Sequence, residues 1–296
     1  MRALPALLLS ATLLFQCTPQ REDSATAEDL PDAVMRVTPS ADEVEERIAA
    51  AQERLQASEA GQRIWQAMEA HGGLTTWYAN GPLAFQFNYQ PLDDGTPRNT
   101  YEVANYWSAQ TRHQLMSDTT VRYGWDGQQA WAVPTDTLIP YNVRFWALTP
   151  YYFVGIPFVL GDPGVNLESV GEDTFEDKTY DLVKVTFGDG VGDAPDDDYV
   201  IYVGREDDRV GAIRYIVSYP GYFPDGGHLP EKLMACDGAQ TVGGITLPEG
   251  YRTFWWKEDQ VGEHITDISV SQVSFRPDLR QDYFATPEGA TVITEM

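Results

Sequence analysis

The chain has 296 residues, which is enough for one large β domain or two domains of ordinary size. A hydrophobic content of 43% supports a buried core. The formal net charge of −25 argues against nucleic acid as a partner, because the protein would repel its phosphates.

The first residues have the pattern of an export signal. Arg2 supplies a positive charge, and residues 3–15 form an apolar run that is too short to cross a bilayer as a helix. Cys17 then stands where bacterial lipoproteins carry their lipid; an ordinary secretory signal cleaved nearby is the alternative. We expect residues 1–17 to be a lipoprotein-type signal peptide ending at a lipidated Cys17. The protein would then be exported to the cell envelope, as an outer-membrane lipoprotein that faces the periplasm.

A disordered tether and two helices are predicted next. Residues 18–39 are polar, acidic and without periodicity, so they would let a folded domain stand off the membrane. Ser40 and Glu43 form a capping-box pattern at the start of an amphipathic segment. Ser58 can cap a second helix, which a pair of glycines ends. His71, near this end, is predicted to be structural rather than catalytic.

From residue 83 onward, apolar and polar residues alternate in short runs. The alternation is clear at Phe85, Phe87 and Tyr89, and again at Val183 and Val185. Turn residues such as Asp-Gly pairs separate the runs. The pattern predicts an antiparallel meander of about eleven to thirteen strands, and with the helices a mainly β (α+β) single domain over residues 40–296.

Residues 145–160, FWALTPYYFVGIPFVL, interrupt the strand pattern with an uncharged apolar run. Pro150, Gly155 and Pro157 break this run, and a transmembrane helix needs about 18 uninterrupted apolar residues. The run must therefore be buried in protein or line an apolar site. We expect short helices on the concave face of the sheet, acting as a lid over a ligand or as a plug that fills the space. The lid is the favoured interpretation.

Side chains in and around this run are the candidate ligand-binding residues. An arginine directly before the run would pair either with a lipid phosphate or carboxylate, or with one of the many acids of the chain. The aromatic side chains would form either a dry core or the wall of a ligand cavity. The full candidate set is Phe85, Phe87, Trp131, Arg144, Trp146, Tyr151, Tyr152, Phe153, Phe158 and Tyr215.

Motifs for catalysis and for cofactor binding are absent from the sequence. It has no GxSxG, HExxH, P-loop or CxxC pattern, and its four histidines are scattered. Cys236 is predicted to be a buried small hydrophobe. We therefore expect neither catalysis nor a cofactor.

An acidic loop, residues 188–198, is a weak candidate for a calcium site. Its candidate ligands are Asp189, Asp193, Asp196 and Asp198. Their spacing does not follow the EF-hand loop, so a solvated hairpin is the favoured interpretation.

The order of these features resembles the LolA/LolB-like carriers: an exported start, helices, about eleven antiparallel strands and a helical insert. Three stretches also look like those of uncharacterised bacterial lipoproteins of that fold: GGLTTWY (72–78), RFWALTPYYFVGIPFVLGDPGVNLE (144–168) and YDLVKVTFGDGVGDAPDDDYVIYV (180–203). The resemblance implies an antiparallel half-barrel, open on one side, whose helices cover an apolar cavity for acyl chains. The soluble carrier of this family has no lipid anchor, so Cys17 favours an anchored acceptor or lipid-binding protein.

The function expected from the sequence is that of a membrane-anchored periplasmic protein. It would hold the acyl chain of a lipid or lipoprotein in an apolar half-barrel cavity without catalysis. Its partners would be that acyl chain or lipoprotein, the membrane through the N-terminal lipid anchor, and an envelope protein. Two other interpretations stay open: an assembly lipoprotein that docks another envelope protein, and a secreted hydrolase whose site the sequence does not reveal.

Overall fold

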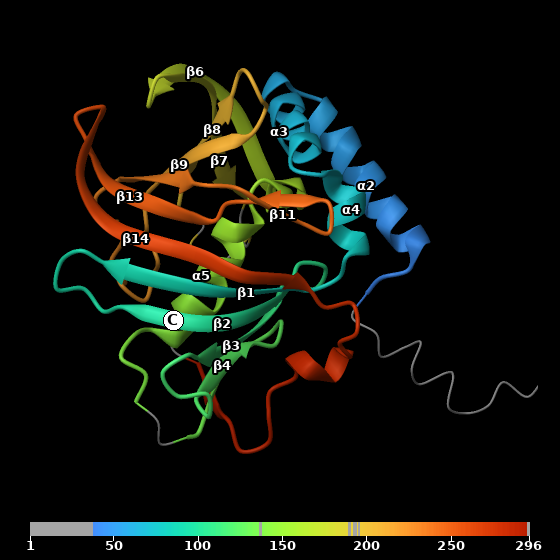
Figure 1. The fold of residues 1–296 in the computed structure, drawn as a ribbon, viewed down its shortest axis with the longest axis vertical. Helices are drawn as coiled ribbons and strands as arrows, with labels where there is room; N and C mark the ends of the chain where they lie inside the picture. The colour runs from blue at the N-terminus through green and yellow to red at the C-terminus, as the bar shows by residue number, and fades with distance from the viewer. Residues whose placement is uncertain (1–37, 136–137, 189–190, 192–193, 195, 295–296) are drawn as a thin grey trace, which may run out of the picture. The chain divides into compact units, whose positions relative to one another are not determined.

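The computed structural model describes residues 38–294, apart from 136–137, 189–190, 192–193 and 195 (Figure 1). The described residues belong to one compact unit, Met35–Met296. The predicted signal peptide, its Cys17 and nearly all of the predicted tether lie outside the described residues, so these features stay predictions.

Helices occupy the start of the described chain and one insert between strands. They are α2 (Ala41–Gln56), α3 (Glu59–Ala70), α4 (Gly73–Ala79) and α5 (Val143–Gly155), with the 3₁₀ turns η1 (Phe158–Gly161) and η2 (Gln281–Phe284). The strands are β1 (Leu83–Pro91), β2 (Arg98–Asn105), β3 (Gln110–Leu115), β4 (Arg122–Trp125), β5 (Ala130–Val133), β6 (Val165–Phe175), β7 (Lys178–Phe187), β8 (Tyr199–Gly204), β9 (Val210–Tyr215), β10 (Lys232–Asp237), β11 (Gln240–Val242), β12 (Ile245–Leu247), β13 (Gly250–Lys257), β14 (Gln260–Phe275) and β15 (Thr291–Ile293).

Thirteen of the described strands form one antiparallel sheet, in the order β15-β5-β4-β3-β2-β1-β14-β13-β10-β9-β8-β7-β6. β11 and β12 form a separate hairpin. The sheet does not close on itself, and Figure 1 shows it curving around α5, with α2, α3 and α4 together at one side. The predicted open antiparallel half-barrel with N-terminal helices and a helical insert is confirmed. Its sheet has thirteen strands, where the family resemblance implied about eleven.

The main core lies on the concave face of the sheet. Side chains alternate along a strand, so in β8 Tyr199, Ile201 and Val203 point into the main core with the helices, whereas Val200 and Tyr202 join a smaller cluster on the outer face. The same alternation runs through the neighbouring strands, because paired residues of adjacent strands share a face. The concave face is therefore where an enclosed site can form.

The C-terminal segment covers part of the outer face. Leu279 and Phe284, which follow β14, pack against Ala84 of β1 and Val103 of β2. Arg112 of β3 donates from Nη1 to the carbonyl of Tyr283 at 2.7 Å, which ties the segment to the sheet. This half of the outer face is thus buried by the protein's own chain.

The N-terminal helices begin where the sequence predicts. Ser40 Oγ accepts the N–H of Glu43 at 3.3 Å, and Glu43 Oε2 accepts the N–H of Ser40 at 2.8 Å, which completes the capping box of α2. Ser58 Oγ accepts the N–H of Gly61 at 3.0 Å and caps α3. Both predicted caps are confirmed.

The short helix α4 was not predicted. Gly72 and Gly73 have φ of 117° and 79°, a left-handed turn that ends α3 as expected. The chain then continues as a helix, and its Leu74 and Trp77 are buried in the main core. A helix of seven residues is too short to show a clear helical period in the sequence.

Helix α5 is the apolar insert, and it lies inside the curve of the sheet (Figure 1). Asn142 caps it by accepting the N–H of Phe145 at 2.9 Å. Pro150 lies within the helix and offers no N–H to its backbone ladder. The helix ends at Gly155, where it packs so closely on Tyr106 that a β-carbon would lie 2.5 Å from the ring. No described helix is both long and apolar enough to cross a membrane.

Candidate functional site

Helix α5 is held by hydrogen bonds on the flank that faces β3. Thr111 Oγ1 and His113 Nε2 both donate to the carbonyl of Ala147, at 2.7 and 2.9 Å. The Tyr106 hydroxyl donates to the carbonyl of Tyr151 at 2.9 Å. These side chains fix the helix backbone against the sheet.

The two residues on Ala147 belong to a buried polar network. Glu102 Oε1 accepts the hydroxyl of Thr100 at 2.6 Å and lies 3.2 Å from Nδ1 of His113. All of them are almost fully buried, and the ring of Tyr123 stacks on His113 with centroids 4.5 Å apart. We call Thr100, Glu102, Thr111 and His113 the polar flank. The polar flank is sealed by protein and serves to position α5.

The opposite flank of α5 borders a cavity of about 360 Å³, which we call the tyrosine pocket. It lies between α5 and the adjacent ends of β7, β8 and β9, and most of its wall is apolar or aromatic. Its lining residues are Ala109, Phe145, Leu148, Thr149, Tyr151, Tyr152, Phe153, Val159, Asp162, Pro163, Val165, Phe187, Val191, Ala194, Asp197, Tyr199, Tyr215, Val217 and Tyr219.

Two carboxylates lie in the wall of the tyrosine pocket, and both have protein partners. Asp197 Oδ1 accepts the N–H and the hydroxyl of Ser218, at 2.5 and 2.8 Å. Asp162 forms an ion pair with Arg47 of α2, with 2.7 Å between Oδ1 and Nη2. Burial raises the pKa of both carboxyl groups above the ordinary value. Both acids therefore contribute to the wall and leave the interior of the pocket largely apolar.

Tyrosine hydroxyl groups provide the remaining polarity. Burial raises the pKa of Tyr152 and Tyr199 well above the usual value, so both hydroxyls stay protonated and can donate. The Tyr199 hydroxyl points to Asp197 at 3.4 Å. The hydroxyl of Tyr152 is buried and has no hydrogen-bond partner among the described residues. An apolar pocket with an uncommitted donor in its wall suits a ligand that is mainly hydrocarbon but carries an oxygen acceptor.

Four of the ten predicted ligand-binding residues line the tyrosine pocket. Tyr151, Tyr152 and Phe153 reach it from α5, and Tyr215 reaches it from the end of β9. Phe153 and Tyr215 are in contact, with ring centroids 4.9 Å apart. The structure therefore brings together the middle of the apolar run and one of the alternating strands.

Four other predicted residues lie on the concave side but away from this pocket. Phe85 and Phe87 of β1 are fully buried in the main core. Phe158 of η1 stacks on Trp77 of α4, with centroids 4.4 Å apart. Trp146 faces away from the tyrosine pocket and lines a different cavity near the start of α5. The three phenylalanines are thus part of the packed core beside the tyrosine pocket and do not line it.

Arg144 and Trp131 do not line the tyrosine pocket. The guanidinium group of Arg144 is buried and lies 3.7 Å from the centroid of the Trp125 ring. Trp131 of β5 pairs with Gly124, and its ring lies near Arg112 on the outer face of the sheet. The pairing register of a strand decides which face of the sheet each side chain occupies. In β5 this register places Trp131 on the outer face, away from the cavity.

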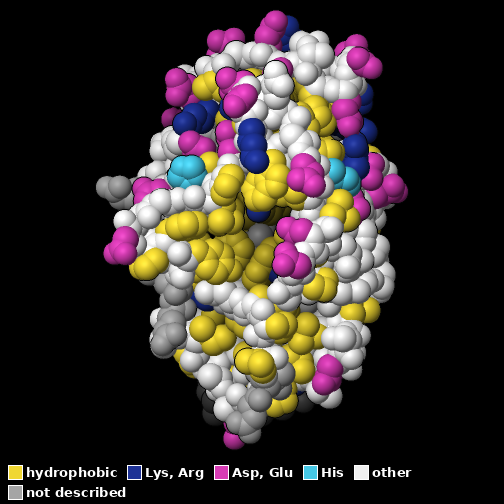
Figure 2. Space-filling view, turned by 90° about the vertical axis from the view of Figure 1, so that its left-hand side faces the viewer, with side chains coloured by type: hydrophobic (Ala, Val, Ile, Leu, Met, Phe, Trp, Pro, Cys, Tyr) yellow, Lys and Arg dark blue, Asp and Glu magenta, His cyan; other side chains and the backbone are white. Residues whose placement is uncertain are grey.

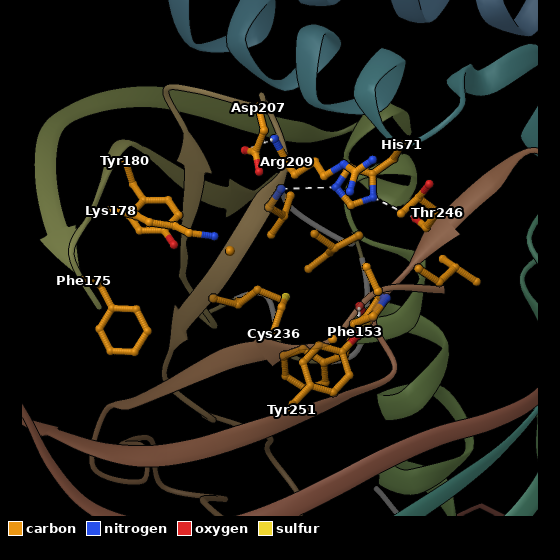
Figure 3. Close-up of a pocket in the computed structure, with 18 of the residues that line it drawn as sticks. His71, Phe153, Phe175, Lys178, Tyr180, Asp207, Arg209, Cys236, Thr246 and Tyr251 are labelled. Carbon is orange, nitrogen blue, oxygen red and sulfur yellow. Dashed lines mark hydrogen bonds between the residues drawn. The ribbon is translucent and has the colours of Figure 1, made fainter. Parts of the chain in front are cut away.

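A third cavity, of about 310 Å³, has a more polar lining (Figure 3). Figure 3 shows Asp207 and Arg209 at one end and Cys236 at the other, with His71 beside Thr246. His71 Nδ1 donates to the carbonyl of Thr246 at 2.8 Å, and its Nε2 accepts the N–H of Val210 at 3.1 Å. Both ring nitrogens are thus occupied, which supports the predicted structural role of His71.

Cys236 lines the same polar cavity. Burial raises the pKa of its thiol to about 12, so the nucleophilic thiolate is disfavoured at neutral pH. This agrees with the interpretation of Cys236 as a packed hydrophobe.

The acidic loop joins β7 to β8, and its best-placed acids turn toward the protein. Asp197 binds Ser218, and Asp198 forms an ion pair with Lys184 at 2.9 Å. Asp189 and Asp193 lie outside the described residues, and among the residues that are described no group of three or more metal-ligating side chains occurs. Calcium binding by the loop stays a prediction.

Sequence reasoning missed several lining residues of the tyrosine pocket. Tyr199 and Phe187 stand at the ends of predicted alternating strands, and Tyr199 pairs with Tyr215 across β8 and β9. The alternation of apolar and polar residues along these strands indicated that both side chains face the core. Val217 and Tyr219 continue the alternation of Ile213 and Tyr215 in the sequence, so the same signal extended to them although β9 ends at Tyr215.

Comparisons with known proteins support the architecture. A model described as a family of unknown function (DUF6503) matches residues 141–227, the segment that holds α5 and, apart from Ala109, the whole described lining of the tyrosine pocket. No curated protein matches the chain. Among solved structures, a LolA superfamily protein from Nitrosomonas europaea aligns over 77% of this chain and 97% of its own, with a TM-score of 0.50 and 10% identity. A DUF1329 family protein from Desulfovibrio piger aligns over 76% and 97%, with a TM-score of 0.48 and 10% identity. The chain therefore has a LolA-like fold.

Proposed function

We propose that this protein binds the acyl chain of a lipid or a lipoprotein in the tyrosine pocket, without catalysis. The observation that carries the proposal is the pocket itself. Its volume of about 360 Å³ falls in the range of about 300–1,000 Å³ that is typical of small-molecule sites. It lies on the concave face of an open half-barrel, where the polar flank holds α5 in place.

Burial of hydrocarbon supplies the affinity. Each CH₂ group removed from water contributes about 0.8 kcal/mol, so a chain of about ten carbons gains about 8 kcal/mol before the costs of association are subtracted. The uncommitted hydroxyl of Tyr152 can donate to a carbonyl oxygen of the ligand. The pocket thus combines a non-directional driving force with one directional contact.

A non-catalytic role agrees with the state of the reactive side chains. His113 and Glu102 are sealed in the polar flank, and both ring nitrogens of His71 are occupied by backbone groups. The thiol of Cys236 is held in its protonated form. None of these groups combines exposure with a free functional atom.

We also propose that the chain acts at the cell envelope. Its apolar start and Cys17 fit export and lipid attachment, which would place the pocket near a membrane that contains acyl chains. Replacing Cys17 by Ala and following incorporation of a fatty-acid label in cells tests the anchor separately from the pocket. Unchanged labelling of the variant would contradict lipidation at Cys17.

The acyl-binding proposal is tested with the purified protein. Native mass spectrometry and lipid extraction should detect bound lipid, and a fluorescent fatty acid should be taken up by protein that has been stripped of lipid. The variant Val217→Trp places a large ring in the pocket and should weaken uptake by about tenfold or more, since it removes space for several carbons.

The matched control is Val292→Trp on the edge strand β15, where the side chain is 39% exposed. This variant should bind the fatty acid as the unchanged protein does. Absence of both co-purified lipid and fatty-acid uptake would contradict the proposal, as would equal uptake by the two tryptophan variants.

A further inference from the structure

A second cavity on the concave side, of about 420 Å³, lies next to the start of α5 and carries positive charge. Its wall includes the side chains of Arg98 and Lys232 and five aromatic residues, Tyr89, Tyr141, Trp146, Tyr222 and Trp255. We call it the cationic pocket. The face with the β1–β2 and β13–β14 turns, at the left of Figure 1, is shown in Figure 2, where a central hollow is rimmed mainly by hydrophobic side chains.

Arg98 is a buried cation with unused donors. Its side chain is enclosed by the rings of Tyr89, Tyr141 and Trp146, and the residue is only 3% exposed. Its Nε and Nη2 atoms have no hydrogen-bond partner among the described residues. Burial lowers the pKa of this guanidinium group, as expected for a cation without a bound anion. Burying an unpaired charge costs free energy, so a ligand that offers a hydrogen-bond acceptor to Arg98 would lower this cost.

Glu102, a buried acid on the same strand, favours the charged form of Arg98 from a distance but does not bind it directly. Glu102 directs Oε1 to Thr100 and His113, and it forms no ion pair with Arg98 within the described chain. The aromatic rings offer attraction to the cation but no carboxylate or carbonyl oxygen. The Nε and Nη2 donors of Arg98 thus remain free to bind a ligand.

Lys232 adds a second cation to the lining. It is half-buried, its Nζ lies 5.2 Å from the centroid of the Trp255 ring, and it makes no ion pair with a described residue. Burial lowers its pKa, and Asp93 acts in the opposite direction. Asp93 is the one acid among the described lining residues, so two cations face one acid in a protein of net charge −25. The cavity would therefore attract an anion, although the net negative charge of the whole protein repels anions.

The start of α5 contributes to the same wall. Asn142, which caps the helix, lines the cavity together with Trp146 of the first turn. The N-terminal end of a helix carries partial positive charge and favours anions. This partial charge has the same sign as the charges of Arg98 and Lys232, so all three would attract an anion.

The cationic pocket and the tyrosine pocket meet at consecutive residues of α5. Phe145 lines the tyrosine pocket, and Trp146 lines the cationic pocket. Phe145 also contacts Tyr222 of the cationic pocket, with ring centroids 5.1 Å apart, and Tyr222 is 42% exposed. This ring contact joins a lining residue of the tyrosine pocket to a lining residue of the cationic pocket.

We propose that the cationic pocket binds the acidic head group of the amphiphile whose acyl chain occupies the tyrosine pocket. Carboxylate and phosphate share the required chemistry: oxygen acceptors with negative charge, which pair with arginine at short distance. The inference rests on the proposed acyl binding, and it narrows the ligand class from lipids in general to anionic amphiphiles.

The test compares head groups on one chain length. Decanoate, decyl phosphate and decanol are titrated into the lipid-free protein, with binding followed by tryptophan fluorescence, because Trp146 and Trp255 line the pocket. The two anions should bind about tenfold or more tightly than decanol, the advantage expected of charge-assisted hydrogen bonds. An advantage limited to decyl phosphate would support the proposal and identify phosphate as the head group.

Variants identify the site. Lys232→Gln should reduce the advantage of the anions, and Arg98→Gln should abolish it, with folding of each variant checked by circular dichroism and thermal unfolding. The matched control is Lys257→Gln. Lys257 also lies over the Trp255 ring, at 6.0 Å, but it is exposed and outside the described lining of the cavity. If Arg98→Gln does not fold, the contrast between the two lysine variants decides the question.

The outcomes separate this inference from the acyl-binding proposal. Equal affinity for all three probes, or equal effects of Lys232→Gln and Lys257→Gln, would overturn the head-group site and leave acyl binding intact. Inorganic phosphate is titrated as a probe without a chain. A response to it that depends on Lys232, in protein that takes up no decyl compound, would support the anion site and contradict the acyl pocket. No response to any of the four probes would overturn both.

Discussion

On its polar flank, α5 is held by side chains that reach its backbone, whereas on the opposite flank it borders an apolar cavity. Thr111 and His113 donate to the carbonyl of Ala147 on the first side. On the second side, Tyr152 extends into the wall of the tyrosine pocket with a hydroxyl that has no described partner. Side chains of the sheet thus reach the backbone of α5 on the first flank, and a side chain of α5 is left without a described partner on the second.

This difference shows how a half-barrel can keep an apolar space open. An apolar helix on an apolar sheet would normally pack until no void remained, because interiors are close-packed. Directional hydrogen bonds to one flank fix the distance and rotation of α5, so the other flank does not close on the sheet. The polar flank therefore acts as a spacer for the tyrosine pocket.

The largest expected effect comes from breaking the polar flank. His113→Ala removes one of the two donors to the Ala147 carbonyl and a fully buried ring that stacks on Tyr123, and should lower the free energy of unfolding by about 3 kcal/mol. Urea denaturation measures the change. Thr111→Val removes a single donor to the same carbonyl and should cost about 1 kcal/mol. Equal losses in the two variants would show that the network does not act as described.

The second largest loss of stability is expected from a substitution at the end of α5. Gly155→Ala adds a β-carbon only 2.5 Å from the Tyr106 ring, and Tyr106 is buried and bonded to α5, so it cannot move away freely. We expect a loss of about 2 kcal/mol in thermal or urea unfolding, typical of overpacking. Gly188→Ala is the control, because its β-carbon would meet neighbours at 3.6 Å and beyond. A Gly155→Ala protein as stable as this control would mean that α5 shifts easily, contrary to a fixed spacer.

The wall of the tyrosine pocket should make stability depend on pH through Asp197. Burial raises the pKa of Asp197 in the folded state, so its contribution to stability is present below the unfolded-state pKa of about 3.9 and is lost as pH rises through the folded-state pKa. Asp197→Asn keeps an acceptor for Ser218 but removes this titration. Relative to the unchanged protein, the variant should become more stable as pH rises from 4 toward neutral, in urea denaturation at each pH. A difference independent of pH would contradict a raised pKa at this site.

The smallest changes in stability are expected when one tyrosine hydroxyl is removed from each flank of α5. Tyr152→Phe removes a group without a described partner and should change stability by less than about 0.5 kcal/mol. Tyr106→Phe removes the hydrogen bond to the Tyr151 carbonyl and should cost about 1 kcal/mol. Denaturation curves of the two variants, measured side by side, test the contrast directly. A larger loss for Tyr152→Phe would mean that the pocket flank also holds the helix.

Local patterns were sufficient to predict the fold class. The capping box at Ser40 and Glu43 and the alternation from Phe85 onward depend on neighbouring residues in the sequence, and both agree with the structure. Local patterns could not predict the order of the strands in the sheet. β14 pairs with β1, and β15 pairs with β5, although these segments are far apart in the sequence. No short-range period specifies these partners.

The candidate site was predicted in part for the same reason. Tyr151, Tyr152 and Phe153 were found because they lie in one conspicuous apolar run, and Tyr215 because it lies on an alternating strand. Trp131 shows the limit, since its face depends on strand register that the sequence leaves undetermined. The cationic pocket was not predicted at all. Arg98 and Lys232 stand on separate strands and meet only through the sheet.

The pairing of β1 with β14 also governs the order in which the molecule can be assembled. Phe87 lies opposite Val270, so the strand that joins the two halves of the sheet is among the last to be made. Until then the apolar helix between the halves has no complete cover, and contacts between such distant segments form slowly. Until β14 is in place, residues 143–155 therefore form a defined apolar segment that a chaperone would need to shield from aggregation.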